Sequence, residues 1–418
     1  MSSGLGVEGN SYFGERVQSS KPGFLFVLPW SIDFPSGVNE VVRNLYWQVQ
    51  EKGGFDPSIV INDWNRTDIT TNNESTIIRF RFRRPWDTGR RFRTLVSFLL
   101  HFPSDCWRLS SMVRTHHAKV INAHFPDLSA LQFVLLKLLG GFRGSIILSF
   151  HGLDIQSAIQ ARGLERIFWK ILLRKVDAIV TCSHDLRKEI SKFAPEVARH
   201  AWTVWNGIDP DRFVMTASHE SCVPKDLRGQ PFLLSVGRFE RKKGQDVLIE
   251  AFLRVLPHHK NLRLVLIGQN GPTSELIRGI VVSRGLQETV ILFENLPHAC
   301  IPWWMKEAKI VVLASRSEPF GIVILEAGMS HKPVIATAVG GVPEILTDGI
   351  TARLVPPENP EALATAINDL LDNSVESEQL AVNLHKRVIA EFTWERAYYE
   401  YVRILDMLCR DAQATVDS

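Results

Sequence analysis

The chain has 418 residues, which suits two domains of about 200 residues each better than a single core. With 45% hydrophobic and 22% charged residues and no low-complexity tract, its composition excludes the disordered, collagenous and coiled-coil classes. Lys and Arg number 48 and Asp and Glu 45, so the formal net charge of +3 is too balanced for the whole molecule to be a nucleic-acid or membrane binder.

The cysteines and the N-terminal segment indicate the compartment. The five cysteines lie far apart and none forms a C-x-x-C pair, so we expect neither a disulfide framework nor a cysteine zinc site. The first twenty residues lack the apolar core of a signal peptide, and no apolar run reaches about 18 residues. These patterns predict a cytoplasmic protein without a membrane-spanning helix.

The first half of the chain alternates short apolar runs with longer amphipathic segments. After a polar tail at 1–22, a first domain is predicted over 23–205. Its strands are expected at 24–28, 58–61, 120–124, 145–150 and 177–182, and its helices at 38–50, 128–139 and 165–175. Strands that are apolar throughout, with helices between them, are typical of a parallel sheet covered on both faces.

The same alternation resumes after a predicted Gly/Pro/Ser-rich linker at 206–230 and defines a second domain over 231–390. A final helix at 391–410 is expected to pack back on the first domain, followed by a tail at 411–418. The second domain's strands are expected at 232–236, 263–267, 290–293, 309–313 and 333–337, and its helices at 245–256, 274–284, 322–330 and 361–372. The sequence therefore predicts an α/β protein of two doubly wound domains, with ligands between them beyond the carboxyl ends of the strands.

The most informative segment is S-R-S-E-P-F-G-I-V-I-L-E-A at 315–327, where a strand leads into a loop and then a helix. Gly321 has no Cβ, so backbone can approach a ligand closely there. The N–H groups of Gly321, Ile322 and Val323 lack helical acceptors and lie at the positive end of the helix dipole. This arrangement suits a diphosphate.

Two carboxylates flank that helix start. Glu318 precedes the helix and Glu326 lies one turn inside it, so both can face one ligand. Because a carboxylate repels phosphate, the hydroxyls of a sugar and a ribose are the better partners. The alternative is that Glu318 caps the helix and Glu326 is a solvated surface acid.

A basic loop precedes this segment in the chain. The sequence S-V-G-R-F-E-R-K-K-G-Q at 235–245 again runs from strand through loop to helix, and it contains Arg238 and Lys243. One Arg side chain can donate hydrogen bonds to two phosphate oxygens at once, whereas Lys contributes a point charge. The alternative interpretation is a solvated basic turn.

Together G-R-F-E-R-K-K-G, S-E-P-F-G-I-V-I-L-E-A and V-G-G-V-P-E-I resemble glycosyltransferase family 4, whose members are retaining enzymes of the GT-B fold. The resemblance covers nearly the whole chain in order. It implies that Arg238 and Lys243 neutralise the donor's diphosphate as the glycosidic bond breaks. It also implies that Glu318 holds the donor sugar, that Glu326 binds the ribose hydroxyls, and that backbone at 321–323 contacts sugar and phosphate.

The first half resembles the family less closely. Gly37 matches its glycine loop near the transferred group, although Ser36 stands where a paired glycine is common. His151 and Asp154, in S-F-H-G-L-D, match its histidine loop, which implies that His151 touches the donor sugar with Asp154 beside it. By itself, a lone His after a strand is more often structural. The loop at 268–271 departs from the family where the base is read, so the nucleotide stays open.

No metal is expected. Asp209-Pro-Asp211 matches the D-x-D motif of a different glycosyltransferase fold, but in the predicted linker a turn or cap is the simpler interpretation. The adjacent pairs His116-His117 and His258-His259 cannot both face one metal from a helix. We predict that cationic side chains take the metal's place.

The stretch 79–114 is unusually rich in arginine. It contains nine arginines and two acids, interleaved with aromatic and aliphatic residues. This composition suits an anionic membrane surface, and equally an ordinary solvated face over a core stripe. Single-stranded nucleic acid is the least favoured partner.

The sequence therefore predicts a retaining, metal-independent glycosyltransferase that moves a sugar from a nucleotide diphosphate sugar to a hydroxyl acceptor. A lipid-linked or surface-polysaccharide precursor is the expected acceptor. The expected location is the cytoplasm, with peripheral association at the inner face of the cell membrane. The alternatives are a hydrolase that uses Glu318 and Glu326, a nucleotide-sugar epimerase on the same fold, and a catalytically silent sugar-nucleotide-binding protein.

Overall fold

The computed structural model describes residues 21–34, 36–71, 75–87, 89, 91–213 and 222–416. The predicted tail at 1–22 lies almost wholly outside them. The chain divides into two compact units. The first comprises Met1–Val180, Glu189–Trp202 and Val402–Ser418, and the second comprises Thr181–Lys188 and Thr203–Tyr401. The predicted linker at 206–230 falls inside the second unit.

The first sheet has eight strands in the order β3-β4-β2-β1-β5-β6-β7-β8. They are β1 (Gly23–Leu28), β2 (Asp56–Asn62), β3 (Ile69–Thr71), β4 (Thr76–Phe80), β5 (Ala118–His124), β6 (Ser145–Phe150), β7 (Ala178–Thr181) and β8 (Ala201–Thr203). From β4 through β6 neighbouring strands pair in parallel, while β3 is antiparallel to β4. After β4 the chain returns to the other side of β1, so the carboxyl ends of β1 and β5 flank a switch point in strand order.

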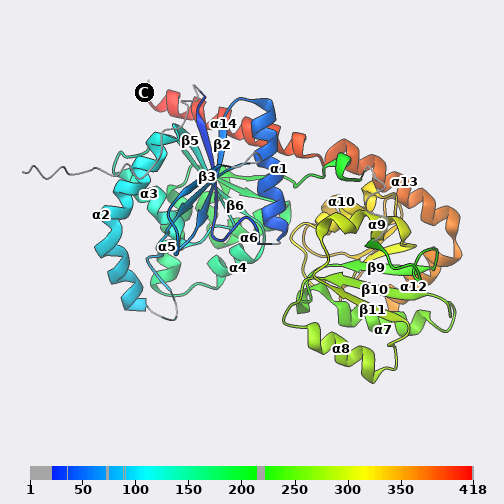
Figure 1. The fold of residues 1–418 in the computed structure, drawn as a ribbon. Helices are drawn as coiled ribbons and strands as arrows, with labels where there is room; N and C mark the ends of the chain where they lie inside the picture. The colour runs from blue at the N-terminus through cyan, green and yellow to red at the C-terminus, as the bar shows by residue number, and fades with distance from the viewer. Residues whose placement is uncertain are drawn as a thin grey trace, which may run out of the picture. The chain divides into compact units, whose positions relative to one another are not determined.

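Helices cover both faces of this sheet (Figure 1). They are α1 (Gly37–Lys52), α2 (Arg91–Thr115), α3 (Leu131–Leu138), α4 (Leu153–Gln160), α5 (Leu164–Lys175) and α6 (His184–Phe193). α1 begins where the Ser36 side chain accepts a hydrogen bond from Asn39 N, and it ends at Gly53 in the left-handed region (φ 72°). Its inward face buries Val41, Leu45 and Val49, among others, over the sheet.

The second sheet has six strands in the order β11-β10-β9-β12-β13-β14, and every recorded pair is parallel. The strands are β9 (Phe232–Val236), β10 (Arg263–Gly268), β11 (Val290–Glu294), β12 (Ile310–Leu313), β13 (Val334–Thr337) and β14 (Arg353–Val355). Because the chain moves outward from β9 to β11 and returns beside β9 as β12, the loops after β9 and β12 meet at the switch point.

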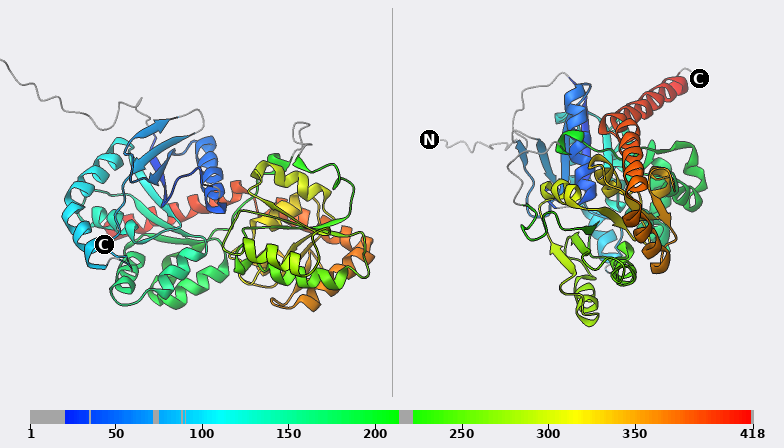
Figure 2. Two further views of the ribbon diagram at one scale, coloured as in Figure 1. Left: turned by 60° about the horizontal axis from the view of Figure 1, so that its bottom comes forward. Right: turned by 90° about the vertical axis from the view of Figure 1, so that its right-hand side faces the viewer.

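Helices again lie on both faces, as the turned views show (Figure 2). They are α7 (Gln245–Val255), α8 (Ser274–Ser283), α9 (Ile301–Glu307), α10 (Ile322–Met329), α11 (Val342–Ile345), α12 (Pro360–Asp372), α13 (Ser374–Glu391) and α14 (Trp394–Val416). The predicted α/β class with two parallel-sheet domains is confirmed. The helix expected at 391–410 is α14, which begins in the second unit and continues into the first at Val402.

The expectation of unpaired cysteines is wrong for one pair. Cys222 and Cys300 form a disulfide with their Cα atoms 5.5 Å apart, although 78 positions separate them in sequence. Cys106, Cys182 and Cys409 are thiols outside any disulfide. Only the folded path of the second unit brings Cys222 to Cys300, so spacing could not reveal the bond. Within the described ranges, no helix is both long and apolar enough to cross a membrane.

Candidate active site

The loop between β9 and α7 carries the cations that the sequence assigns to a diphosphate. Arg238 Nη1 lies 3.1 Å from Glu240 Oε1, and Lys242 Nζ lies 2.9 Å from Glu240 Oε2. Lys243 turns to another partner, because its Nζ donates to Glu318 Oε2 at 2.6 Å. Burial raises the pKa of Glu240, but the hydrogen bond from Lys242 and the nearby cations outweigh it and hold that pKa below its ordinary value.

The pair between Lys243 and Glu318 joins the two loops of the switch point. The Glu318 side chain is only 9% exposed and that of Lys243 22%, so water screens their attraction less than that of a surface pair. Ser315 Oγ lies 3.5 Å from the same carboxylate oxygen. The alternative in which Glu318 caps α10 is wrong, because the cap residue is Gly321 and no side chain bonds there.

Arg316 fastens the same two loops a second time, a role that the sequence did not reveal. Its Nη1 and Nη2 donate to the two carboxylate oxygens of Asp246 at 2.7 and 2.8 Å, and its Nε bonds to Glu358. Its Nη1 also donates to Arg241 O at 2.8 Å, and its backbone N donates to Lys242 O at 2.7 Å. Burial opposes ionisation of Asp246, but Arg316 holds its pKa below the ordinary value. The partners lie 70 and 42 positions away in sequence, so no local pattern marks this residue.

The start of α10 is the anion-binding geometry that the sequence predicts. Gly321 has a φ of 103°, and a Cβ there would lie 2.8 Å from Ile324 Cδ1, so a larger residue would be strained. The first backbone bond of the turn runs from Ile324 N to Gly321 O. Among the described residues, the N–H groups of Ile322 and Val323 have no acceptor, which leaves them available to a ligand.

Glu326 lies inside α10 and is buried, with 2% of the residue exposed. The interpretation of Glu326 as a solvated surface acid is therefore wrong. His298, in the short 3-10 turn that precedes α9, places its Nε2 2.9 Å from Glu326 Oε1. His298 was not singled out from the sequence, because an isolated His in a polar loop carries no signal of its own.

The V-G-G-V-P-E-I segment packs its backbone against the loop that contains Glu318. Gly341 N donates to Glu318 O at 3.0 Å. Gly340 has a φ of 55°, and a Cβ there would lie 2.2 Å from Glu318 O, so only glycine allows this approach. The two glycines therefore fix the position of the Glu318 backbone relative to the sheet.

Glu344, in the same segment, is a further residue that the sequence did not reveal. Its carboxylate accepts bonds from His184 N at 2.9 Å, Asp185 N at 3.0 Å and Trp205 Nε1 at 2.9 Å. A carboxylate at the N-terminus of α6 satisfies N–H groups that have no helical acceptor. Glu344 thus has a positioning role within the second unit.

In the first unit, His151 follows β6 and Asp154 closes its loop. Asp154 is 1% exposed, and its carboxylate accepts from His151 N, Gly152 N and Ile155 N at 2.6–3.1 Å. Burial raises the pKa of Asp154 to about 7, although these N–H bonds act in the opposite direction. The carboxylate thus binds the loop's own backbone and positions His151.

His151 has a partner that the sequence did not indicate. Its Nε2 lies 3.1 Å from Nδ1 of His124, at the end of β5, and the two rings stack with centroids 5.3 Å apart. Burial lowers the pKa of His151 to about 4. The pKa of His124 is lowered well below 6.5 by burial and by the charge of His151. Both imidazoles are therefore neutral near pH 7, and each can donate or accept a hydrogen bond.

Gly37 is the first residue of α1, beside the switch point of the first sheet. Its loop is held by Asn39, which is 2% exposed and whose Nδ2 donates to the carbonyl groups of Ser31, Ile32 and Phe34. The predicted residues thus fall into two groups. Gly37, His151 and Asp154 belong to the first unit, and Arg238, Lys243, Glu318, Gly321, Ile322, Val323 and Glu326 belong to the second.

The D-x-D sequence forms a turn, in which Asp209 Oδ1 accepts from Asp211 N at 3.0 Å. In the part of the chain that the structure describes, no three His, Cys, Asp or Glu side chains gather into a metal-binding group. That the reaction needs no metal stays a prediction.

Comparisons with known proteins agree with this architecture. Residues 35–212 match the family model described as Glycosyltransferase Family 4, and residues 224–387 match Glycosyl transferases group 1. The solved structure of HepE from Anabaena in complex with UDP and glucose superimposes with a TM-score of 0.73 at 17% identity, covering 91% of this chain and 99% of that one.

Curated relatives match over part of their length. The glycogen synthase of Mycobacterium tuberculosis is 30% identical over 225 residues, which is 54% of this chain and 52% of the relative. A lipopolysaccharide core biosynthesis mannosyltransferase of Rhizobium leguminosarum is 26% identical over 57% of this chain and 66% of its own. Because the two family models together span most of both halves, the chain belongs to the group 1, family 4 glycosyltransferases, and it has the GT-B fold.

Proposed function

We propose that this glycosyltransferase moves a sugar from a nucleotide diphosphate sugar to a hydroxyl acceptor, with retention of the anomeric configuration and without a metal. The observation that carries the proposal is the partly buried pair of Lys243 and Glu318 beside the start of α10. It places a cation, a carboxylate and unbonded N–H groups at one switch point. A nucleotide diphosphate sugar presents matching chemistry, because its charged diphosphate lies between the hydroxyls of the sugar and those of the ribose.

Each group has a distinct part in this proposal. Lys243 and Arg238 stabilise the charge that develops on the leaving diphosphate, together with the N–H groups at 321–323. Glu318 and Glu326 accept hydrogen bonds from hydroxyls, the first from the sugar and the second from the ribose. In the first unit, His151 contacts the donor sugar as a neutral imidazole, and Gly37 leaves room for the transferred group.

In the chemical step, the bond between the sugar C1 and the diphosphate oxygen breaks while a bond from C1 to the acceptor oxygen forms on the same face. The acceptor proton passes to the departing phosphate oxygen, so the protein supplies no covalent nucleophile. The cations carry the leaving charge, which is the contribution that a metal makes in other transferases.

The donor and acceptor classes rest on related proteins. A structure of HepE contains UDP and glucose, and one relative is named a lipopolysaccharide core mannosyltransferase. We propose by analogy a nucleotide diphosphate sugar as donor and a lipid-linked or surface-polysaccharide precursor as acceptor. The enzyme would then work in the cytoplasm, peripheral at the inner face of the cell membrane.

The test has two stages. Thermal-shift titration with UDP, GDP and ADP identifies the base, since the nucleotide that binds raises the melting temperature most. The matching nucleotide sugars are then incubated with a glycolipid extract and EDTA, and NMR reads the product's anomeric configuration. A retained linkage supports the proposal, while an inverted linkage or a need for added metal overturns it. Free sugar without transfer indicates a hydrolase, an isomerised donor an epimerase, and binding without turnover a silent protein.

A further inference from the structure

Helix α2 carries an apolar row on its outward face. Phe92, Val96, Leu99, Leu100 and Trp107 are exposed, with fractions from 52% at Val96 to 80% at Phe92. With 3.6 residues per turn their spacing confines them to about 100° of the helix circumference. We call these five residues the α2 stripe. Single exposed apolar residues are common, but a continuous row marks an interaction surface.

The stripe is not the core face of α2. Phe98, Leu109, Met112 and Val113 are buried and lie on the opposite side of the helix. α2 packs with them against α3 and β5. The helix is therefore already anchored in its own unit, while among the described residues of that unit its second apolar face remains exposed.

The charges around the stripe are of one sign. The 25 residues of α2 contain a single acid, Asp105, which is 4% exposed and whose carboxylate accepts from Arg83 Nη1 at 2.5 and 2.7 Å. Arg93, Arg108 and Arg114 are exposed on the same helix. The stripe is thus flanked by exposed cations and by no exposed acid of α2, which is the pattern of interfacial helices on anionic lipid.

Not every arginine of the stretch contributes. Arg79 is bonded to Asp68 at 3.0 Å and Arg84 to Asp127 at 2.6 Å, so these two charges are met within the protein, as is that of Arg83. Arg90 lies outside the described residues. The count of nine arginines therefore overstates the surface charge. Arg93 and Arg114 are exposed cations of α2, whereas Arg108 lines a pocket beside β4.

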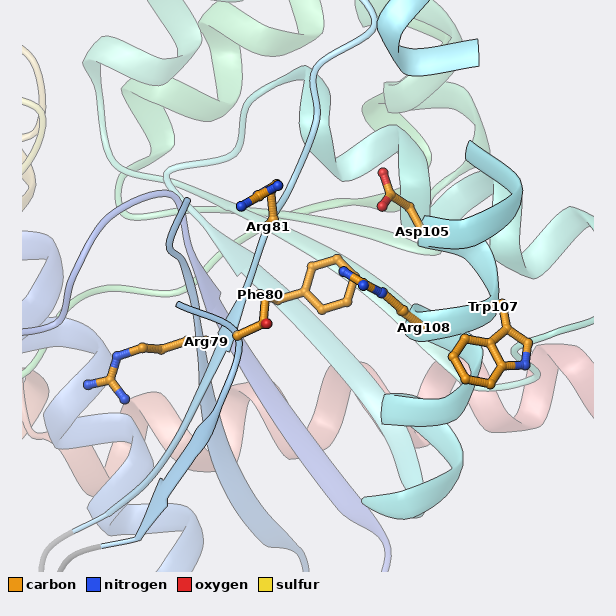
Figure 3. Close-up of a pocket in the computed structure, with 7 residues that line it drawn as sticks. Arg79, Phe80, Arg81, Asp105, Trp107 and Arg108 are labelled. Atoms are coloured by element: carbon orange, nitrogen blue, oxygen red, sulfur yellow. The ribbon is translucent and has the colours of Figure 1, made fainter. Parts of the chain in front are cut away.

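A shallow pocket lies at the Trp107 end of the stripe (Figure 3). Arg79, Phe80 and Arg81 line it from β4 and the residue after it, and Asp105, Trp107 and Arg108 line it from α2. The Arg81 guanidinium also stacks on Trp64, 5.3 Å from the ring centre, and Trp64 is 52% exposed. Indole rings beside guanidinium groups suit the headgroup region of a bilayer, where a ring has one apolar and one wet side.

We propose that α2 is the membrane-docking element of this glycosyltransferase and lies along an anionic phospholipid surface. The stripe enters the boundary between headgroups and acyl chains, and Arg93 and Arg114 meet the phosphates. A second copy of the chain fits less well, because paired α2 helices would bring cations together without an acid. Single-stranded nucleic acid fits less well because Val96, Leu99 and Leu100 cannot stack on bases.

The inference deepens the proposed function and rests on it for the reason to be at a membrane. α2 connects β4 to β5, two strands that run parallel, so it starts near the carboxyl edge of the first sheet and ends near the other edge. Gly37 and His151 also follow the carboxyl ends of their strands. A lipid-linked acceptor would thus be presented at the edge where the proposed chemistry occurs.

Vesicle co-sedimentation of the full chain tests the proposal. We use phosphatidylcholine vesicles with and without phosphatidylglycerol, at low and high salt. The wild type should sediment with the anionic vesicles in a salt-sensitive manner. Leu99→Ser with Leu100→Ser should weaken that binding at least tenfold, as should Arg93→Gln with Arg114→Gln. Leu276→Ser with Val282→Ser, at two exposed positions of α8, is the matched control and should bind as the wild type does. Circular dichroism and melting temperature verify folding of each variant.

Several outcomes overturn the proposal. Full vesicle binding by the Leu99/Leu100 variant removes the stripe from the interface, and equal binding to neutral vesicles removes the charge requirement. A dimer that the variant abolishes, without vesicle binding, assigns the stripe to a second copy. Tight binding of an oligonucleotide that competes with vesicles assigns it to nucleic acid. Transfer to a soluble acceptor, measured in parallel, fails only if the proposed function fails, so the two hypotheses are tested separately.

Discussion

Lys243 Nζ lies 2.6 Å from Glu318 Oε2, and this contact joins the loop after β9 to the loop after β12. The cation is thus held at the switch point before any donor arrives. A diphosphate sugar would share Lys243 with the carboxylate and would give Glu318 hydroxyls as new partners. The pair therefore links binding of the donor's diphosphate to binding of its sugar.

The first prediction concerns this cation. Lys243→Ala should lower kcat by about two to three orders of magnitude, because one donor to the leaving-group charge is lost. Lys242→Ala is the matched control, since Lys242 lies in the same loop but pairs with Glu240 at 2.9 Å. Steady-state kinetics with the preferred donor decides between them. Near-normal turnover of the Lys243 variant would remove its assigned role.

The second prediction concerns Arg316, which we assign as a positioning residue. Arg316→Ala should lower the free energy of unfolding by about 1.5–3 kcal/mol, the usual range for a hydrogen bond to a charged group. It should also raise KM for the donor more than it lowers kcat, because the side-chain hydrogen bonds that join the two loops are lost. Arg316→Lys should not rescue, since a single ammonium cannot bond both oxygens of Asp246.

The control for that prediction is Arg254→Ala. Arg254 forms an exposed pair with Glu250 at 3.9 Å on α7, and such pairs contribute less than about 1 kcal/mol. Chemical denaturation measures both variants. If the two lose the same stability and neither changes KM, Arg316 is an ordinary surface cation.

The third prediction is a pH dependence of stability in the first unit. The pKa of His151 is about 4 when folded and near 6.5 when unfolded, so the unfolded chain binds an extra proton between those values. The contribution of His151 to the free energy of unfolding therefore rises with pH from about 4 to 6.5. Buried His124, whose pKa is also lowered, changes the free energy of unfolding in the same direction. Asp154 acts oppositely. Its folded pKa of about 7 lies above its ordinary value of 3.8, so its contribution falls as pH rises through that window.

The contributions of the two buried histidines rise with pH and that of the one carboxyl group falls. The free energy of unfolding should therefore show a net rise with pH. Thermal melts of His151→Gln should show a flatter rise between about pH 4 and 6.5 than the wild type, by at most about 1.4 kcal/mol per pH unit. His200→Gln, which alters a partly buried His on the same unit, is the comparison. An unchanged slope in the His151 variant would contradict the neutral buried state.

The fourth prediction concerns the disulfide. Cys222→Ser with Cys300→Ser should lower stability by about 2–4 kcal/mol, because the bond closes a long loop in the unfolded chain. It should also raise KM for the donor, since Cys300 lies in the same turn as His298, which contacts Glu326. Cys106→Ser, at a free cysteine, should do neither. Melting curves of the wild type with and without dithiothreitol test the same effect, because the reductant should lower the melting temperature by breaking the disulfide.

That pair also bears on the proposed compartment. The sequence favours a reducing environment, whereas a bond between Cys222 and Cys300 needs an oxidising one to persist. Mass spectrometry of the protein after alkylation in the cell separates the two cases. A fully alkylated pair would indicate that the two cysteines lie side by side but remain reduced in the cell.

The sequence predicted the regular elements well where apolar runs are continuous. The predicted strands at 232–236 and 263–267 match β9 and β10 closely, because most residues of both strands are buried and therefore apolar. β3 and β8 were missed because three residues do not establish a period. The region of α2 was described only by composition, since its two apolar faces obscure the usual amphipathic pattern.

The candidate site was predictable in part, for a physical reason. Lys243, Glu318 and Glu326 stand in compact local motifs, so charge and helix position indicated them. Arg316 and His298 act on partners that are distant in sequence, and His124 lies at the end of a strand that is otherwise apolar. Contacts made across the sheet leave no periodic signal along the chain.

The α2 stripe has a consequence for handling the protein. Without lipid, five large apolar side chains face water on a helix that is otherwise well anchored. We expect purified material to adhere to columns and to cluster as it is concentrated. Mild detergent should keep it dispersed, whereas high salt should worsen the clustering by screening the arginines that keep copies apart. Crystals grown without an amphiphile would most readily bury this row against a neighbouring molecule.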